Sequence, residues 1–297
     1  MTIDLFLQYL ANAFALGSMY ALIAIGYTII YGVVRLINMA HGDFFMVAAF
    51  LTMWGVSQLA FPWYVAFLLA TLVTVAIGLL AERIAYRPLR KVKISSFIGA
   101  TSISFILQNS FVVFFTARSK PFPHPQFLDE VIVIGTVSIP VVTVFIVIAS
   151  AVLFLVLSYI VTHTKMGRAM RAVSKDLEAA MMMGVDADRI IAFAFILSTT
   201  YAAAGAFLWC SRFPFVSPFT GVIPGLKAFI GAVMGGIGSI PGALVGGFLL
   251  GLAEIMLVAF MPSLTGFRDI FAYLLLILFL LFRPGGIFNV KVREEKV

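Results

Sequence analysis

Long uninterrupted apolar runs constrain this chain more than any other feature. Residues 139–162, for example, contain no charged side chain. A helix needs about 20 mostly apolar residues to cross the hydrocarbon core of a bilayer. Charged residues make up only 11% of the sequence, against the ~25% usual in soluble domains. This composition excludes a soluble enzyme, a disordered chain and a nucleic-acid-binding domain, and the continuous runs argue against a membrane barrel.

The sequence therefore predicts an all-α polytopic membrane protein with about eight or nine transmembrane helices, forming one domain over residues 1–297. A shorter, glycine-rich segment, 222–238, could cross the membrane or form a broken, re-entrant helix. The first apolar run lacks the features of a cleaved signal peptide and is expected to remain as a span. The clear candidate spans are 9–32, 43–60, 62–82, 95–116, 139–162, 190–210, 241–261 and 267–283.

Lysines and arginines are distributed unevenly between the predicted loops. Of the 20 in the chain, five lie in 83–93, five in 163–189 and four after residue 282, and Arg35 lies on the same side. The positive-inside rule places this side in the cytoplasm. The C-terminus is then cytoplasmic and the N-terminus external. That arrangement requires an odd number of crossings, which favours 222–238 as a span.

Two loops stand out, and neither is large enough to be a catalytic domain. The external stretch 117–138 contains several prolines followed by a Val/Ile-rich run, and we expect a short structured loop that contains a strand. The stretch 163–189 is the longest cytoplasmic loop. The dipeptide Gly-Lys does not occur, so the chain has no P-loop and cannot be its own ATPase. The histidines are scattered without metal-ligand spacing, and we find no convincing internal repeat.

Small residues recur at four-residue intervals in several predicted spans. Such faces let helix backbones approach closely. They indicate tight packing within one subunit or, alternatively, an interface between subunits. The candidates for close helix packing are Gly17, Gly235, Gly242 and Gly246.

Polar residues within the predicted spans are candidates for a substrate path. Asn38, His41 and Asp43 lie between two spans with almost no loop, where polar groups are costly unless they are paired or wet. Asp43 also suits the first turn of a helix. Glu254 is the only acid well inside a predicted span. It could form a structural bond between helices or have a functional role. The path candidates are Asn38, His41, Gln108, Asn109, Thr199 and Glu254.

The cytoplasmic loop is predicted to contain a short amphipathic helix. Ser174 or Asp176 can cap its start, and Glu178 suits its first turn. A methionine-rich face fits adaptable contacts with a partner protein, although a helix lying on the bilayer is the alternative. Four small or apolar residues recur at helical spacing and are predicted to share one face: Leu177, Ala180, Met181 and Gly184.

Three stretches in this order resemble a known family. They are residues 16–43, including the specific run Asn38-Met-Ala40-His41-Gly42-Asp43; residues 167–184; and the glycine-rich run 229–247. Together they resemble the LivH-like permeases, the membrane subunits of bacterial ABC importers of branched-chain amino acids. Glu178-Ala179-Ala180 followed by Gly184 is similar to the start of the EAA motif of importer permeases. The Leu-Pro of the wider motif is missing.

The resemblance implies a permease that forms a translocation path with a second, homologous permease in the bacterial inner membrane. Two P-loop ATPase subunits would drive it and bind ATP and magnesium, and an external binding protein would deliver substrate. The chain itself would then be no enzyme, hold no cofactor or metal, and contact membrane lipid but no nucleic acid. The resemblance assigns ATPase coupling to Arg171, Ser174, Asp176, Leu177, Glu178, Ala179, Ala180, Met181 and Gly184.

Two alternatives remain beside this interpretation. A permease of the same family could carry urea or short amides. A proton-coupled secondary transporter could use Glu254, but the sequence shows neither paired intramembrane acids nor an inverted repeat. A membrane-embedded enzyme would need clustered nucleophiles, acids or metal ligands at one depth, and the sequence shows none.

Overall fold

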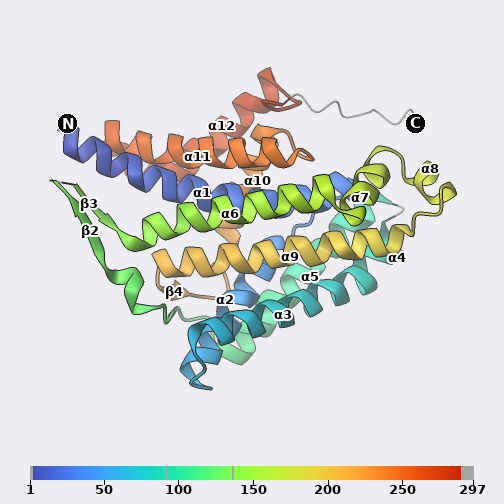
Figure 1. Ribbon diagram of the computed structural model, residues 1–297, viewed down its shortest axis with the longest axis horizontal. Helices are drawn as coiled ribbons and strands as arrows, with labels where there is room; N and C mark the ends of the chain where they lie inside the picture. Colours follow the sequence, from blue (N-terminus) through green and yellow to red (C-terminus); the bar gives the residue numbers. More distant parts are fainter. Residues whose placement is uncertain (1–2, 91, 136, 289–297) are drawn as a thin grey trace.

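The computed structural model describes residues 3–90, 92–135 and 137–288, and most of them are helical (Figure 1). A π-helical turn, η1 (Glu82–Tyr86), joins α3 to α4, and two 3-10 turns, η2 (Gln126–Asp129) and η3 (Pro262–Phe267), lie in loops. The helices are α1 (Ile3–Val34), α2 (His41–Ser57), α3 (Trp63–Ala81), α4 (Arg87–Leu89), α5 (Lys93–Phe115), α6 (Val141–His163), α7 (Lys165–Lys175), α8 (Leu177–Met182), α9 (Ala187–Arg212), α10 (Val222–Gly235), α11 (Ile240–Phe260) and α12 (Arg268–Phe282).

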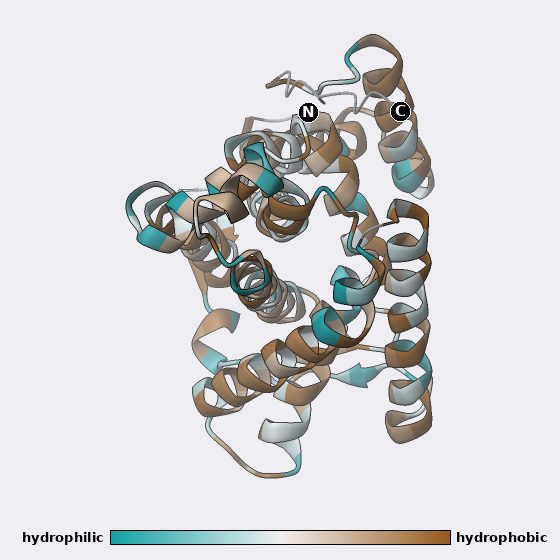
Figure 2. Ribbon diagram, turned by 90° about the vertical axis from the view of Figure 1, so that its right-hand side faces the viewer, coloured by the Kyte–Doolittle hydropathy of each residue, from teal (hydrophilic) through white to brown (hydrophobic). Residues whose placement is uncertain are grey.

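Within the described residues, seven helices are long and apolar enough to cross a membrane. They are α1, α3 with its π-helical extension, α5, α6, α9, α11, and α12 with η3. The all-α polytopic fold is thus confirmed. The predicted spans 43–60 and 222–238 are the short helices α2, of 17 residues, and α10, of 14 residues. Figure 2 shows how much of the helical ribbon is hydrophobic when viewed from the end that carries α8.

Each short helix follows a long one through an unwound segment. α1 ends at Val34 because Arg35 adopts a left-handed φ of 55°, and residues 36–40 then run back toward the interior. α9 ends at Arg212, and Pro214 and Pro218 prevent the helix from continuing before α10 begins. α2 and α10 therefore complete crossings that begin as irregular chain. The segment before α2 is largely buried, as irregular backbone at membrane depth requires, whereas the segment before α10 is partly exposed at Phe213, Phe215 and Phe219.

The two three-helix units α1–α2–α3 and α9–α10–α11 run in opposite directions. Ser198 on α9 bonds to Gly26 on α1, whereas Gly205, further along α9, packs on Ile23, earlier in α1. α1 and α9 are therefore antiparallel. Each long helix packs on the third helix of the other unit, α1 on α11 and α9 on α3. The structure thus contains an inverted repeat in the order and direction of its helices, which the sequence, where no convincing internal repeat is visible, does not reveal.

Glycines set the closest helix contacts within this core. A Cβ on Gly251 would lie 2.4 Å from Gly17 Cα, so α11 lies directly on α1. A Cβ on Gly235 would lie 1.8 Å from the carbonyl oxygen of Gly242, and one on Gly246 would lie 2.1 Å from that of Gly231. The predicted close-packing glycines therefore face helices of the same chain.

The two ends of the helix bundle differ. One end, the hairpin end, carries the hairpin of β2 (Val131–Ile134) and β3 (Val137–Pro140) and the short pair of β1 (Lys120–Pro121) with β4 (Phe215–Val216). The structured loop with a strand predicted in 117–138 is therefore confirmed. The opposite end, the α8 end, carries α7 and α8. Figure 1 shows the start of α1 at the hairpin end and the last described residues on the other side.

Candidate functional site

The unwound segment before α2 carries polar residues deep into the bundle. His41 is fully buried, and a Cβ on Gly26 would lie 2.3 Å from the His41 ring. Gly26 lies nine residues before Arg35 on α1, which places His41 roughly 13 Å inside the α1 terminus at 1.5 Å per residue. The His41 ring therefore occupies the space that a glycine on α1 leaves open.

Hydrogen bonds hold this imidazole between α1 and α9. Ser198 Oγ lies 3.2 Å from His41 Nδ1 and donates to the carbonyl oxygen of Gly26 at 2.8 Å. Because the hydroxyl proton is used on that carbonyl, His41 Nδ1 is the donor to Ser198. The Tyr27 ring packs against the imidazole at a centroid distance of 4.4 Å. His41 thus links α2, α1 and α9 at one point.

Asn38 ties the unwound segment to the end of α3. Its Oδ1 accepts a hydrogen bond of 2.5 Å from the hydroxyl of Tyr86 in η1, and both side chains are almost fully buried. A π-helical turn is uncommon and is frequent at functional sites. Tyr86 lies at the end of this turn with its side chain buried, and its ring also packs on Phe195.

Asp43 connects the first turn of α2 to α5. Its Oδ1 accepts a 2.8 Å hydrogen bond from Gln108, which also reaches Ser104 on the preceding turn of α5. Asp43 is 3% exposed. A buried carboxylate is costly unless it is paired or bonded, and Gln108 supplies that bond.

The N-termini of α2 and α10 meet beside this cluster. A Cβ on Gly221 would lie 1.7 Å from the carbonyl oxygen of Gly42, so only glycine fits there. Helix N-termini carry partial positive charge, and half-helices ending at the membrane midplane are suited to anionic groups of a substrate. In this conformation the backbones of Gly42 and Gly221 are in contact, which leaves no space for a substrate group between the two helix N-termini.

The structure brings Asn38, His41 and Gln108 into one interior cluster with Asp43, and it places the other path candidates elsewhere. Thr199 is buried against Gly78 and donates to the carbonyl of Phe195 in its own helix. Asn109 lies on the exposed face of α5 and bonds to its own backbone. Glu254 belongs to a separate network.

Glu254 forms a buried ion pair with Lys227 of α10. Lys227 Nζ lies 2.7 Å from Glu254 Oε1 and 2.7 Å from Asp269 Oδ1, and both Lys227 and Glu254 are nearly inaccessible. Tyr20 of α1 donates to Glu254 Oε2 at 3.1 Å, and Arg268 Nε lies 3.4 Å from Oε1. The network joins α1, α10, α11 and α12.

At the α8 end, two helices form the predicted cytoplasmic loop. Thr164 caps α7, and Asp176 caps α8 by accepting a hydrogen bond from the amide of Ala179 at 3.0 Å. Ala180 is buried, whereas Met182 and Met183 are 87% and 85% exposed. The prediction that Gly184 shares the α8 face is wrong, because α8 ends at Met182 and Gly184, with a φ of 82°, turns the chain out of the helix.

The other predicted coupling residues surround this helix pair. Arg171 of α7 donates to the carbonyl oxygens of Val161 and Thr162, and the carbonyl oxygen of Ser174 accepts from Arg35 at 3.5 Å. Leu177 and Met181 are partly exposed beside Glu178. α7 is therefore anchored to the end of α6 and to α1, while α8 projects.

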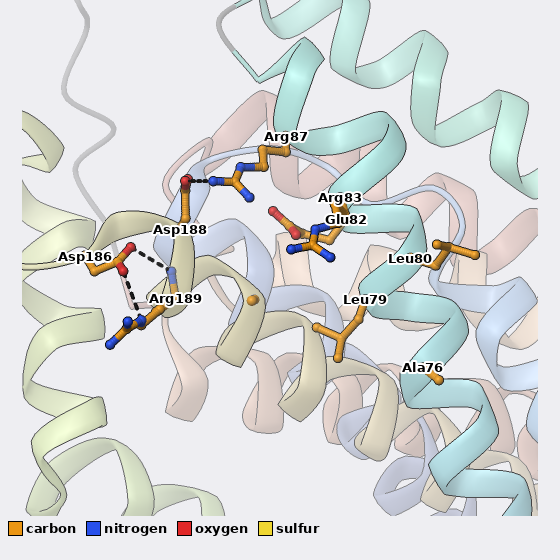
Figure 3. Close-up of a pocket in the computed structure, with 10 residues that line it drawn as sticks. Ala76, Leu79, Leu80, Glu82, Arg83, Arg87, Asp186, Asp188 and Arg189 are labelled. Atoms are coloured by element: carbon orange, nitrogen blue, oxygen red, sulfur yellow. Dashed lines mark hydrogen bonds and ion pairs between the residues drawn. The ribbon is translucent and has the colours of Figure 1, made fainter.

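Ion pairs connect the start of α9, just after α8, to α4 and the residue that follows it. Asp188 pairs with Arg87 (Figure 3). It also pairs with Arg90 at 2.7 Å. Arg87 directly follows Tyr86, which bonds to Asn38. A continuous series of contacts therefore runs from the projecting helix to the interior cluster.

Comparison with known proteins identifies the family of the chain. Residues 9–280 match the family described as branched-chain amino acid transport system / permease component. The chain belongs to this permease family. It is 39% identical to the high-affinity branched-chain amino acid transport system permease protein BraD of Pseudomonas aeruginosa and 37% identical to LivH of Escherichia coli (strain K12), with 98% of each chain covered. No solved structure matches the chain.

Sequence reasoning missed two groups of residues in this permease. Lys227 was not among the candidate residues, although a lysine within a glycine-rich apolar helix could have signalled a buried acid as its partner. Tyr86 and Asp188 lie at the ends of apolar runs, where nothing in the sequence distinguishes them from ordinary boundary residues. Their roles depend on the π-helical turn and on the packing of α3 against α9.

Proposed function

We propose that this permease is one of two membrane subunits of an importer for branched-chain amino acids in the cytoplasmic membrane of a bacterium. A second, homologous permease would complete the path, and an external binding protein would deliver the substrate at the hairpin end. Two P-loop ATPases would dock at the α8 end and bind ATP and magnesium. The relatives named above, which align over nearly the whole chain, support the substrate class.

One observation supports the coupling role. α8 projects from the bundle and exposes two methionines, while the adjoining helix α7 is anchored to α6 and α1. Met182 and Met183 are too exposed to stabilise this chain alone. Methionine surfaces suit adaptable protein contacts. α8 lies at the end where the basic loops gather, which the positive-inside rule assigns to the cytoplasm.

The mechanism follows from the contacts behind α8. Movement of α8 with the ATPases displaces the start of α9, and Asp188 transmits it to Arg87 and Arg90. Tyr86 then shifts with its bond to Asn38, which repositions the unwound segment before α2. Opening the contact between Gly42 and Gly221 would expose two helix N-termini to a substrate carboxylate.

Co-purification tests this proposal. A tagged chain is extracted from its native host in mild detergent, and the accompanying proteins are quantified. We expect two P-loop ATPases and a second permease. Met182→Glu should reduce the retained ATPase by about tenfold, because the new charge would face the apolar surface of the ATPase that receives α8. The second permease should stay bound.

Val133→Glu is the matched control, since Val133 is also exposed, at 66%, but lies in the hairpin at the opposite end. It should leave ATPase retention unchanged. A chain that purifies without ATPases would refute the importer assignment. Equal retention by the wild type and Met182→Glu would refute the role of α8.

A further inference from the structure

A groove of about 480 Å³ opens between the end of α3 and the start of α9, at the boundary between apolar helix and polar loop. Its upper rim is charged, and its lower wall is apolar. Figure 3 shows side chains from both helices extending toward one another across it. The lining residues are Ala76, Leu79, Leu80, Glu82, Arg83, Arg87, Asp186, Asp188, Arg189 and Ala192.

Most charges of the rim neutralise one another. Asp188 pairs with Arg87 across the groove, and Asp186 pairs with Arg189 at 3.0 Å within α9. Glu82 and Arg83 are different: among the described residues neither forms an ion pair within 4 Å. Both extend from the end of α3 toward α9 (Figure 3).

Glu82 is the stronger indication of a ligand. The residue is 5% exposed, and its Oε1 is buried without a hydrogen-bond partner among the described residues. Leaving a carboxylate oxygen unpaired in such a place is costly. A positively charged donor entering the groove would relieve that cost, and Arg83 beside it offers a site for an anion.

The apolar wall extends from this charged rim along the outside of α3. Leu80 is 56% exposed, and Leu72 and Val73, two turns earlier, are 57% and 46% exposed. These side chains lie on a span, so hydrocarbon chains cover them. A ligand of the groove would thus meet one negative and one positive side chain at the rim, and hydrocarbon chains below.

We propose that the groove binds an ethanolamine phospholipid, with its ammonium on Glu82, its phosphate on Arg83 and an acyl chain along Leu80. The headgroup carries one cation and one anion, which complement the carboxylate of Glu82 and the guanidinium of Arg83. A choline headgroup has no N–H to donate to Glu82, and a glycerol headgroup has no cation. This site is independent of the transported substrate.

Native mass spectrometry of the purified full-length chain tests the site, using phosphatidylethanolamine, phosphatidylcholine and phosphatidylglycerol with identical acyl chains. We expect the wild type to bind the ethanolamine lipid about tenfold more tightly than the choline lipid, as one charge-assisted hydrogen bond provides. Glu82→Gln should abolish this preference. Arg83→Gln should weaken both lipids by a similar factor, because each has the same phosphate.

Matched controls make the same chemical changes at exposed positions of the other end, Glu130→Gln and Arg118→Gln, and should change nothing. If Glu82→Gln does not fold, the exposed Arg83→Gln variant carries the test. Equal affinity of the wild type for the ethanolamine and choline lipids would overturn the proposal. Displacement of the bound lipid by free leucine would also overturn it, because the groove would then be a site for a soluble zwitterion.

Discussion

Replacing Lys227 by methionine should destabilise the protein strongly. The change keeps the length and apolar stem of the side chain but removes the ammonium 2.7 Å from Glu254. Glu254 would keep only Tyr20 and the half-exposed Arg268, which lies farther away at 3.4 Å. Removing one partner of a buried ion pair costs about 3–5 kcal/mol, because the other charge is left uncompensated.

A second change distinguishes the effect of the uncompensated Glu254 charge from that of the other contacts of Lys227. Glu254→Gln in the Lys227→Met background removes the orphaned charge while keeping an acceptor for Tyr20, and Asp269, with a side chain 51% exposed, can be solvated. The double variant should therefore recover most of the loss. At roughly 2–4 °C per kcal/mol, the single change should lower the apparent Tm in detergent by about 6–20 °C.

The measurement is thermal unfolding of the purified chain followed by intrinsic fluorescence, with the wild type and both variants in one detergent. A loss below about 1 kcal/mol for Lys227→Met would refute a buried ion pair. A double variant as unstable as the single variant would show that the ammonium acts through other contacts. After either result, Glu254 could still be the proton-binding carboxylate of a secondary transporter.

Three further changes test other contacts. Gly221→Ala should destabilise the protein by about 1–3 kcal/mol through overpacking, measured by the same unfolding assay, whereas Gly266→Ala, with open space around it, should stay within ~0.5 kcal/mol. Tyr86→Phe should cost about 1–3 kcal/mol because it leaves a buried acceptor unpaired. Asp188→Arg should abolish ATP-driven transport while changing the free energy of unfolding by under about 1 kcal/mol, since the ion pair with Arg87 is partly exposed. Adding Arg87→Asp should restore transport. Failure to restore it would contradict transmission of movement through this ion pair.

Composition and periodicity predicted the helical membrane fold and nearly every long helix. Those features depend on local apolar length, which the sequence displays directly. The start of α8 was also predictable, because Asp176 followed by Glu178 is a local capping pattern. The end of α8 was missed because Gly184 was read as part of the helical spacing, whereas its left-handed φ ends the helix.

The candidate site was predictable only in part. Asn38 and His41 stood out as polar residues between apolar runs, but their partners Tyr86 and Ser198 come from distant segments. The inverted repeat escaped notice because backbone direction, rather than residue identity, relates its halves. One sequence argument against a secondary transporter, the absence of such a repeat, therefore does not hold. The match to the permease family decides the question instead.

Uptake by the purified complex in proteoliposomes tests the central claim most directly. Labelled leucine and binding protein are supplied on the side of the hairpin end, and ATP on the side of the α8 end. We expect accumulation that requires ATP, persists with a protonophore and is lost in Met182→Glu. Uptake that needs a proton gradient, proceeds without ATP and is lost in Glu254→Gln would contradict it.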